Sequence, residues 1–131
     1  MLDGELMERA IQSRKFAYAP YSGFKVGAAL LASNGKVYTG CNIENASYTP
    51  TVCAERAAFF KAVSEGIREF EKIAVVGGRD ELKEYCPPCG VCRQVMAEFC
   101  DPRSFRILLG NSPGNYRVFT LDELFPMSFK L

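Results

Sequence analysis

The chain has 131 residues and a formal net charge of +1, and 48% of its residues are hydrophobic and 24% charged. This length suits a single domain over residues 1–131, and no apolar run approaches the roughly twenty residues of a membrane helix. Basic residues are scattered among acidic ones, which argues against nucleic-acid binding, and the acidic N-terminal segment does not resemble a secretory signal, so we expect a cytoplasmic protein.

The first element is predicted to be a helix over Asp3–Tyr18. Leu6, Ala10 and Ala17 recur there at helical spacing, and Pro20 would end the helix. A hairpin should follow, because two short runs rich in Val, Leu and Tyr flank an Asn-Gly pair that can supply positive backbone dihedrals. These runs are Lys25–Ala32 and Lys36–Thr39, joined across Asn34-Gly35.

A second helix is predicted over Ala54–Ser64, which is rich in helix-forming residues and is followed by Gly66. Its packing candidates are Ala57, Phe60 and Ala62. The remaining elements follow from apolar runs and turn residues, and they are the strand Ile73–Val76, the helix Gly90–Phe99, the strands Phe105–Leu109 and Tyr116–Thr120, and a short helix Leu121–Phe125. The order αββαβαββα predicts an α/β fold with one mixed five-stranded sheet covered on both faces by helices, a three-layer α/β/α arrangement.

The chain has six cysteines and no histidine. In a reducing cytosol, such cysteines are used for metal binding or catalysis more often than for disulfides. The absence of histidine excludes Ser-His-Asp and Cys-His catalysis and every zinc site that needs imidazole. Any zinc ion must therefore be bound by thiolates or carboxylates. Cys41 and Cys100 are interpreted as ordinary buried thiols.

Two cysteine motifs stand at the predicted starts of helices: Cys53-Ala54-Glu55-Arg56, and Pro88-Cys89-Gly90-Val91-Cys92. The unpaired amides and the dipole at a helix N-terminus favour a thiolate there. A metal ion beyond both helix ends could bind Cys53, Cys89 and Cys92. Three thiolates leave the fourth tetrahedral position open for water, as in catalytic zinc sites.

Cys86 competes with Cys92 as the partner of Cys89. Sulfur ligands of one zinc ion lie about 3.8 Å apart. Pro87 and Pro88 should keep the chain extended at about 3.1 Å per residue, which draws Cys86 away. Residues three apart in a helical turn have Cβ atoms about 5 to 6 Å apart, so this comparison favours the pair with Cys92.

Glu55 and Arg56 each have a functional and an ordinary interpretation. Glu55 beside a zinc ligand is a candidate proton carrier for zinc-activated water, although a first-turn glutamate also stabilises the helix dipole. Zinc with three thiolates carries a net negative charge, and Arg56 could withdraw part of it from the sulfurs. The alternative for Arg56 is a solvated helix residue.

These motifs resemble the zinc-dependent cytidine deaminase family in its short homotetrameric form, in which a zinc ligand lies two residues before a glutamate and P-C-x-x-C follows. The runs Ala19-Pro20-Tyr21-Ser22 and Asn42-Ile43-Glu44-Asn45 are also similar to the family. The resemblance covers nearly the whole chain. It implies a cytidine-deaminase-like fold, one Zn²⁺ per subunit, active sites at subunit interfaces, and hydrolysis of cytidine and deoxycytidine to uridine and deoxyuridine by zinc-activated hydroxide, in pyrimidine salvage.

The resemblance also implies substrate contacts. Asn42 and Glu44 would bind the ribose 3′-hydroxyl, which suits a free nucleoside better than a nucleotide, or they would only order the loop. Phe24 would pack against the pyrimidine, or belong to the core. The Ala54 amide would bind the pyrimidine carbonyl, or be an ordinary helical amide. Phe129 would cap the base in a neighbouring subunit, with Phe125 as its rival.

Three other functions remain open at this level. The protein could deaminate a related nucleoside or a nucleoside antibiotic with the same catalytic residues. It could be a non-enzymatic module in which Cys41 or Cys86 supplies a fourth zinc ligand. It could also be a thiol redox protein that uses Cys86 and Cys89. Metal content and loss of cytidine absorbance would distinguish these functions.

Overall fold

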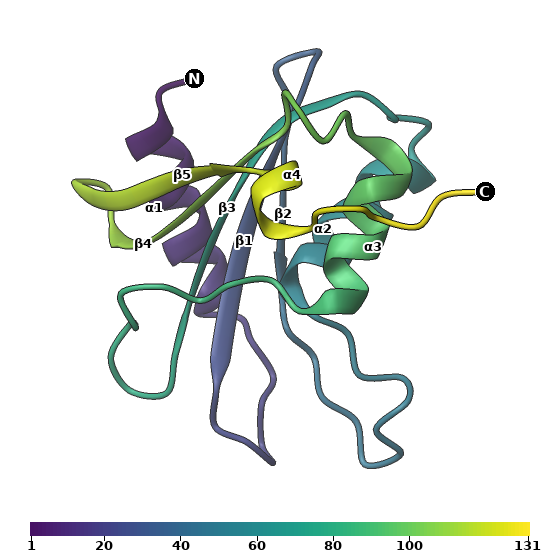
Figure 1. Ribbon diagram of the computed structural model, residues 1–131. Helices are drawn as coiled ribbons and strands as arrows, with labels where there is room; N and C mark the ends of the chain where they lie inside the picture. Colours follow the sequence, from purple (N-terminus) through teal and green to yellow (C-terminus); the bar gives the residue numbers. More distant parts are fainter.

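The computed structural model describes residues 1–131 as a sheet of five strands with four helices (Figure 1). The elements in chain order are α1 Asp3–Arg14, β1 Lys25–Ala32, β2 Val37–Cys41, α2 Ala54–Ser64, β3 Phe70–Gly78, α3 Gly90–Phe99, β4 Arg106–Ser112, β5 Asn115–Thr120 and α4 Leu121–Leu124. This is the order that the sequence predicts. No helix combines the length and the apolar character that a bilayer crossing requires.

The sheet is mixed, with the strand order β2-β1-β3-β4-β5. Only β3 and β4 run parallel, with Ile73 opposite Ile107, and α3 lies in the connection between them. The other neighbours are antiparallel, including β1 and β3, where Lys25 faces Gly78. A parallel pair needs such a crossover connection, and this one carries the second cysteine motif.

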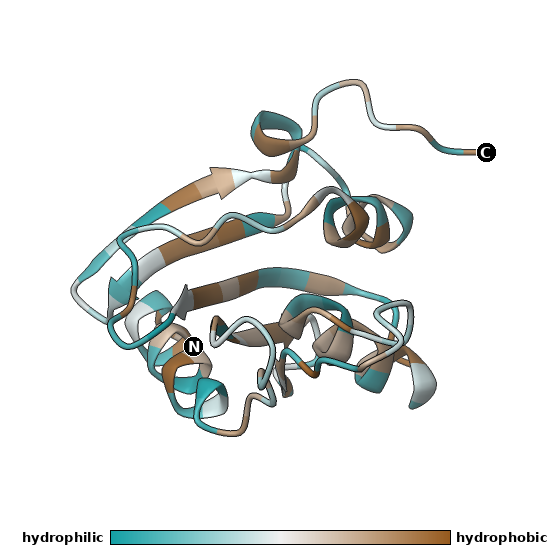
Figure 2. Ribbon diagram, turned by 90° about the horizontal axis from the view of Figure 1, so that it is seen from below, coloured by the Kyte–Doolittle hydropathy of each residue, from teal (hydrophilic) through white to brown (hydrophobic).

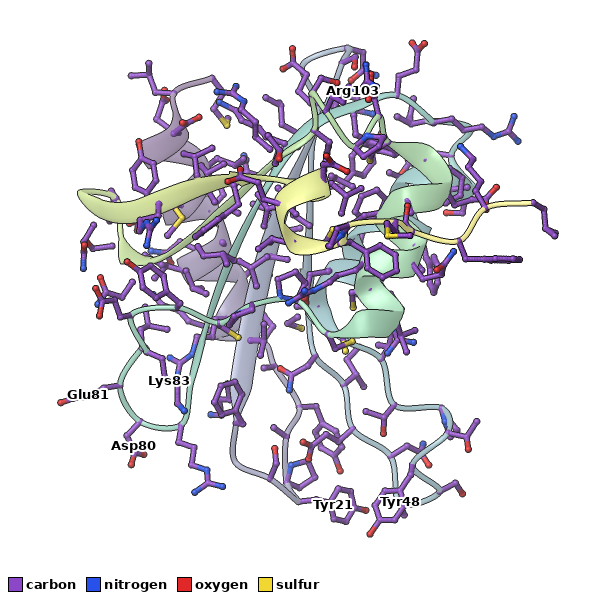
Figure 3. All side chains as sticks on the ribbon, in the orientation of Figure 1. Tyr21, Tyr48, Asp80, Glu81, Lys83 and Arg103 are labelled. Carbon is purple, nitrogen blue, oxygen red and sulfur yellow. The ribbon has the colours of Figure 1, made fainter.

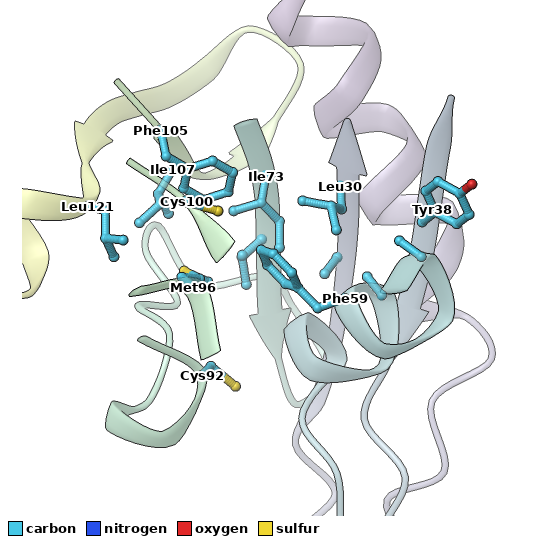
Figure 4. Packing of buried hydrophobic residues seen from close by; sticks show 14 of the residues in the cluster. Leu30, Tyr38, Phe59, Ile73, Cys92, Met96, Cys100, Phe105, Ile107 and Leu121 are labelled. Carbon is cyan, nitrogen blue, oxygen red and sulfur yellow. The ribbon is translucent and has the colours of Figure 1, made fainter. Parts of the chain in front are cut away.

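Helices cover both faces of the sheet, which confirms the three-layer prediction. Alternate residues of β1 point to opposite faces, as a strand requires. Ala29 and Leu31 pack with Leu6 and Ala10 of α1. On the other face, a larger apolar cluster joins the sheet to α2, α3 and α4 (Figure 4). Apolar segments accordingly concentrate along the inner strands in Figure 2.

Several predicted boundaries are wrong. The first helix ends at Arg14 and not at Tyr18, because the backbone of Tyr18 pairs with a distant loop: its N–H donates to Asn42 O at 2.9 Å, and its carbonyl accepts from Glu44 N–H at 2.8 Å. The strands β3 and β4 extend to Gly78 and Ser112, beyond the predicted ends. Strand pairing lengthens both segments.

Smaller corrections concern α2 and the hairpin turn. Phe60, a predicted packing residue, is 50% exposed, and its neighbour Phe59 is fully buried against Phe70 and Phe99. In the β1–β2 turn, Gly35 alone has a positive φ, of 91°. Gly66 has a φ of 88° and follows the end of α2, as predicted.

Close packing of β2 against α2 fixes where α2 begins. A Cβ atom at Gly40 would lie 2.3 Å from the carbonyl oxygen of Ala54 and 2.7 Å from the amide nitrogen of Ala58. Only glycine allows this approach. At the same end of the molecule, the loops before β1, after β2 and after β3 lie near one another, with Tyr21, Tyr48 and Lys83 on them (Figures 1 and 3).

Candidate active site

Three cysteine thiols converge where α2 and α3 begin. Cys53 and Cys89 are the N-cap residues of α2 and α3, and their Sγ atoms lie 3.6 Å apart. Cys92 is in the first turn of α3, and all three Sγ atoms lie within 4.8 Å of one another. This separation and this donor set fit a zinc ion. The structure thus brings together the three thiols that the sequence predicts as ligands.

Cys41 and Cys86 lie outside this group of thiols. Cys86 packs against β3, since a Cβ atom at Gly77 would lie 2.5 Å from its Sγ and 3.1 Å from the Phe24 ring. Burial raises the pKa of the Cys86 thiol to about 11. Cys100 is buried in the larger cluster as predicted, but Cys41, predicted to be buried, is only half-buried at the end of β2.

The surroundings of Cys53 favour its thiolate form. A hydrogen bond from the Cys92 thiol, supported by Arg56, lowers the pKa of Cys53 to about 5 against the opposing effect of burial. The same hydrogen bond raises the pKa of Cys92, the donor. Arg56 donates from Nη2 to Cys53 Sγ at 3.4 Å, and its buried Nε has no protein partner. Arg56 therefore contacts the cluster directly, as its predicted role requires.

Glu55 lies in the first turn of α2, between Cys53 and Arg56 in the sequence, and only 4% of it is exposed. Burial raises the pKa of its carboxyl to about 7, and the charge of Cys53 adds to the rise. A first-turn glutamate that served only the helix dipole would be solvated and ionised. A buried carboxyl with a pKa near 7 is instead suited to accept and donate a proton at neutral pH.

Asn42 and Glu44 follow β2, and both side chains bind the loop that precedes β1, while Asn42 also binds β1 itself. Asn42 Nδ2 donates to Phe24 O at 2.8 Å, and Asn42 Oδ1 accepts from Val26 N–H at 2.8 Å. Glu44 Oε1 accepts from the N–H groups of Tyr21 and Ser22. Both residues therefore order this loop, which is one of the two roles considered for them; the other is ribose binding. Their remaining hydrogen-bonding capacity keeps the other interpretation open.

Phe24 belongs to neither apolar cluster of the core. It lines an open pocket of about 620 Å³ with four charged residues of the β3–α3 loop, Arg79, Asp80, Glu81 and Lys83. Lys83 Nζ lies 5.7 Å from the centroid of the Phe24 ring. The core interpretation of Phe24 is therefore wrong, and its ring faces a pocket.

Three further residues concern the helix start and the C-terminal segment. Ala54 is fully buried as the first residue of α2. Phe129 is 67% exposed, and its carbonyl oxygen accepts from Gln94 Nε2 at 3.0 Å. Phe125 is half-buried against the larger cluster. Of the two phenylalanines, only Phe129 leaves most of its ring free within one chain.

Comparison with known proteins agrees with this site. The cytidine and deoxycytidylate deaminase zinc-binding region matches residues 2–107. The chain belongs to this deaminase family. A cytidine deaminase of Halalkalibacterium halodurans is 54% identical over 95% of this chain and 91% of its own. The crystal structure of cytidine deaminase from Burkholderia pseudomallei is 49% identical, with a TM-score of 0.90 over 98% of this chain and 100% of its own.

A further relative acts on a different compound. A blasticidin-S deaminase of Bacillus cereus is 31% identical over 97% of this chain and 91% of its own. Family membership therefore leaves more than one nucleoside-like substrate to test.

Sequence reasoning missed two contacts of this site. Ser22 was part of a run similar to the family, but no role was predicted for it, and its hydroxyl joins Glu44 to Phe24. Arg93 follows the second zinc motif and binds Pro88 O at 2.7 Å and also Leu124 O. Ser22 reaches Glu44, 22 positions away, and Arg93 reaches Leu124, 31 positions away, so local patterns carry no signal for these two links.

Proposed function

We propose that this protein catalyses the hydrolysis of cytidine and deoxycytidine to uridine and deoxyuridine, with release of ammonia. The convergence of three thiols at two helix ends, beside the buried carboxyl of Glu55, carries this proposal. The relatives at 49–54% identity named cytidine deaminase support the choice of substrate.

Cys53, Cys89 and Cys92 would hold one zinc ion per chain. When bound, zinc would supply Lewis-acid activation of water at neutral pH. Arg56 would offset the excess negative charge of three thiolates through its contact with Cys53.

Glu55 would move protons between water and substrate. Its carboxylate would accept a proton from the water that attacks C4 of cytosine and deliver it to the ring nitrogen N3. It would then take a second proton from the new hydroxyl on C4 and give it to the amino group as the C4–N bond breaks, which leaves a carbonyl at C4. One water is consumed and one ammonia is released, so atoms and charge balance. A pKa near 7 allows both protonation states of Glu55 at neutral pH.

The substrate would lie between the loops that surround this site. Asn42 and Glu44 would bind the ribose 3′-hydroxyl, Phe24 would pack against the pyrimidine ring, and the Ala54 amide would bind its carbonyl. A phosphate beside the Glu44 carboxylate would be repelled, which favours nucleosides over nucleotides.

We also propose that the chain is one catalytic domain that acts as a homotetramer in cytoplasmic pyrimidine salvage, with Phe129 capping the base in a neighbouring subunit. Exposed apolar side chains support self-association, because large ones at the surface of an isolated chain favour burial against a partner. They are Phe16, Tyr18, Ile43, Tyr48 and Phe129.

The test is metal analysis of the purified protein with an activity panel of cytidine, deoxycytidine, cytosine, their monophosphates and blasticidin S. We expect about one zinc per chain and hydrolysis of both nucleosides. Glu55→Gln should retain zinc and lose about 10²- to 10⁴-fold in turnover. Glu98→Gln, an exposed change in α3, is the matched control. A zinc-free protein, or one that hydrolyses only blasticidin S, would refute the proposal.

A further inference from the structure

The hydroxyl of Ser22 joins two residues of the proposed substrate site. It donates a hydrogen bond to Glu44 Oε2 and accepts one from the N–H of Phe24 at 3.0 Å. The backbone N–H groups of Tyr21 and Ser22 also donate to Glu44 Oε1, at 2.9 and 3.2 Å. The loop before β1 therefore holds both oxygens of the Glu44 carboxylate.

Phe24 is held from its other side by Asn42, whose Nδ2 donates to the Phe24 carbonyl oxygen at 2.8 Å. Asn42 and Glu44 are two residues apart, so Ser22, Phe24, Asn42 and Glu44 form a closed ring of contacts between the loop before β1 and the loop after β2. We call these four residues the loop clamp. Within the clamp, Ser22 alone bonds through its side chain to both Phe24 and Glu44.

The loop clamp leaves donors and acceptors free for a ligand. An ionised carboxylate has about four lone-pair positions, and Glu44 uses three of them. The amide of Asn42 uses one of its two N–H groups and one lone pair of its oxygen. A free acceptor on Glu44 and a free donor on Asn42 match a hydroxyl group, which can donate to the first and accept from the second.

An open pocket lies beside Ser22 and Glu44 of the loop clamp. Its volume is about 300 Å³, and it is lined by Tyr21, Ser22, Glu44, Asn45, Tyr48 and Thr51. Tyr21 and Tyr48 lie at the tips of two adjacent loops, at the end of the molecule where the substrate loops meet (Figure 3). Ser22 and Glu44 therefore meet on a surface that a ligand can reach.

We propose that Ser22 is a positioning residue for the substrate: its hydroxyl fixes the carboxylate of Glu44 for the sugar and the backbone of Phe24 for the base. This inference rests on the proposed function, because it needs a pyrimidine nucleoside in the site. Ser22 acts through Glu44 and Phe24 and takes no part in the chemical step. Its removal should therefore affect binding more than turnover.

The first test is steady-state kinetics of Ser22→Ala with cytidine. We expect KM to rise about tenfold, which corresponds to the loss of about 1.4 kcal/mol of binding, and kcat to stay within about twofold. Ser22→Thr keeps the hydroxyl and should restore most of the parent KM. Ser33→Ala removes an exposed serine in the β1–β2 turn and should match the parent.

A double-mutant cycle separates positioning from general loop stability. In a Glu44→Ala background, Ser22→Ala should raise KM by much less than in the parent, since part of its effect passes through Glu44. An equal effect in both backgrounds would overturn the proposal. So would a KM for Ser22→Ala within twofold of the parent, or a fall in kcat and melting temperature without a change in KM.

The outcomes for the two proposals differ. If the parent does not deaminate cytidine, the proposed function fails. If the parent is active and Ser22→Ala has an unchanged KM, only the role of Ser22 fails. Should Ser22→Ala not fold, Ser22→Thr and Ser22→Cys still decide, because a positioning role requires that KM follow hydrogen-bond strength in the order Ser or Thr, then Cys.

Discussion

The Sγ atoms of Cys53 and Cys89 lie 3.6 Å apart, although these residues are 36 positions apart and precede two different helices. The β2–α2 contact at Gly40 and the crossover between β3 and β4 together place the two helix ends side by side. The fold, and not the local sequence, brings these cysteines together. Each cysteine can be tested as a ligand by its own substitution.

Cys86 should be dispensable for metal binding. It packs against Gly77 of β3 and lies outside the cluster of three thiols. We expect Cys86→Ser to retain about one zinc per chain after dialysis against a chelator, and Cys92→Ser to lose it. Metal analysis of both variants decides the ligand set. Zinc loss from Cys86→Ser alone would reverse the assignment.

Gly40→Ala should destabilise the protein. The added methyl group would collide with the backbone of α2 at Ala54 and Ala58, which cannot move without displacing the helix. We expect a loss of about 1–3 kcal/mol in the free energy of unfolding, measured by urea denaturation. Gly114→Ala is the control, since nothing lies within 4 Å of its Cβ position. Equal stability of the two variants would contradict this account of β2 packing.

Arg93→Lys should release the C-terminal segment. The guanidinium of Arg93 binds the carbonyl oxygens of Pro88 and Leu124, and an ammonium group cannot reproduce this planar geometry. We expect faster proteolysis after α4 and a loss of about 1–3 kcal/mol in stability. Arg103→Lys, at an exposed position, should behave as the parent does. Identical digestion patterns for both variants would show that Arg93 does not hold this segment.

The titration of Glu44 should depend on Ser22. The Ser22 hydroxyl, with the N–H groups of Tyr21 and Ser22, lowers the pKa of Glu44 by bonding to its ionised form. These bonds stabilise the folded loop above the unfolded pKa, about 4.3, and this stabilisation is lost as pH falls through the lower folded value. In Ser22→Ala, the pKa should rise toward its ordinary range. Carboxyl ¹³C NMR titration measures the pKa of Glu44 in the parent and in Ser22→Ala. Equal pKa values would argue against the hydrogen bond from Ser22 to Glu44.

Local sequence patterns predict much of this fold. The helices Ala54–Ser64 and Gly90–Phe99 have the predicted bounds because local signals mark them: helix formers and Gly66 for the first helix, and Pro87 and Pro88 before the second. Phe59 was missed in favour of Phe60, although Ala58 and Ala62 share its buried face. Aligning the helix on these alanines would have found it.

Contacts between distant segments account for the remaining errors. The first helix stops at Arg14 because Tyr18 pairs with residues 42 and 44, a partnership that no local pattern contains. The contact of Ser22 with Glu44 likewise joins two loops 22 positions apart. The three thiols were predictable because their chemistry limits the choice of partners. Hydrogen-bonding residues in loops have no such limit.

The buried carboxyl of Glu55 is required for the proposed activity but lowers the stability of the fold when it is ionised. Its pKa of about 7 in the folded chain means that a bound proton favours folding below the unfolded value, about 4.3, and that this contribution is lost as pH rises through about 7. At pH 8 the native protein must therefore keep an unfavourable buried charge that Glu55→Gln lacks. In the metal-free protein, we expect Glu55→Gln to resist urea better than the parent at pH 8, with a smaller difference at pH 5. A variant less stable than the parent at pH 8 would show that the ionised Glu55 carboxylate does not destabilise the fold. The side chain assigned to proton transfer is thus one that selection for a durable fold alone would replace.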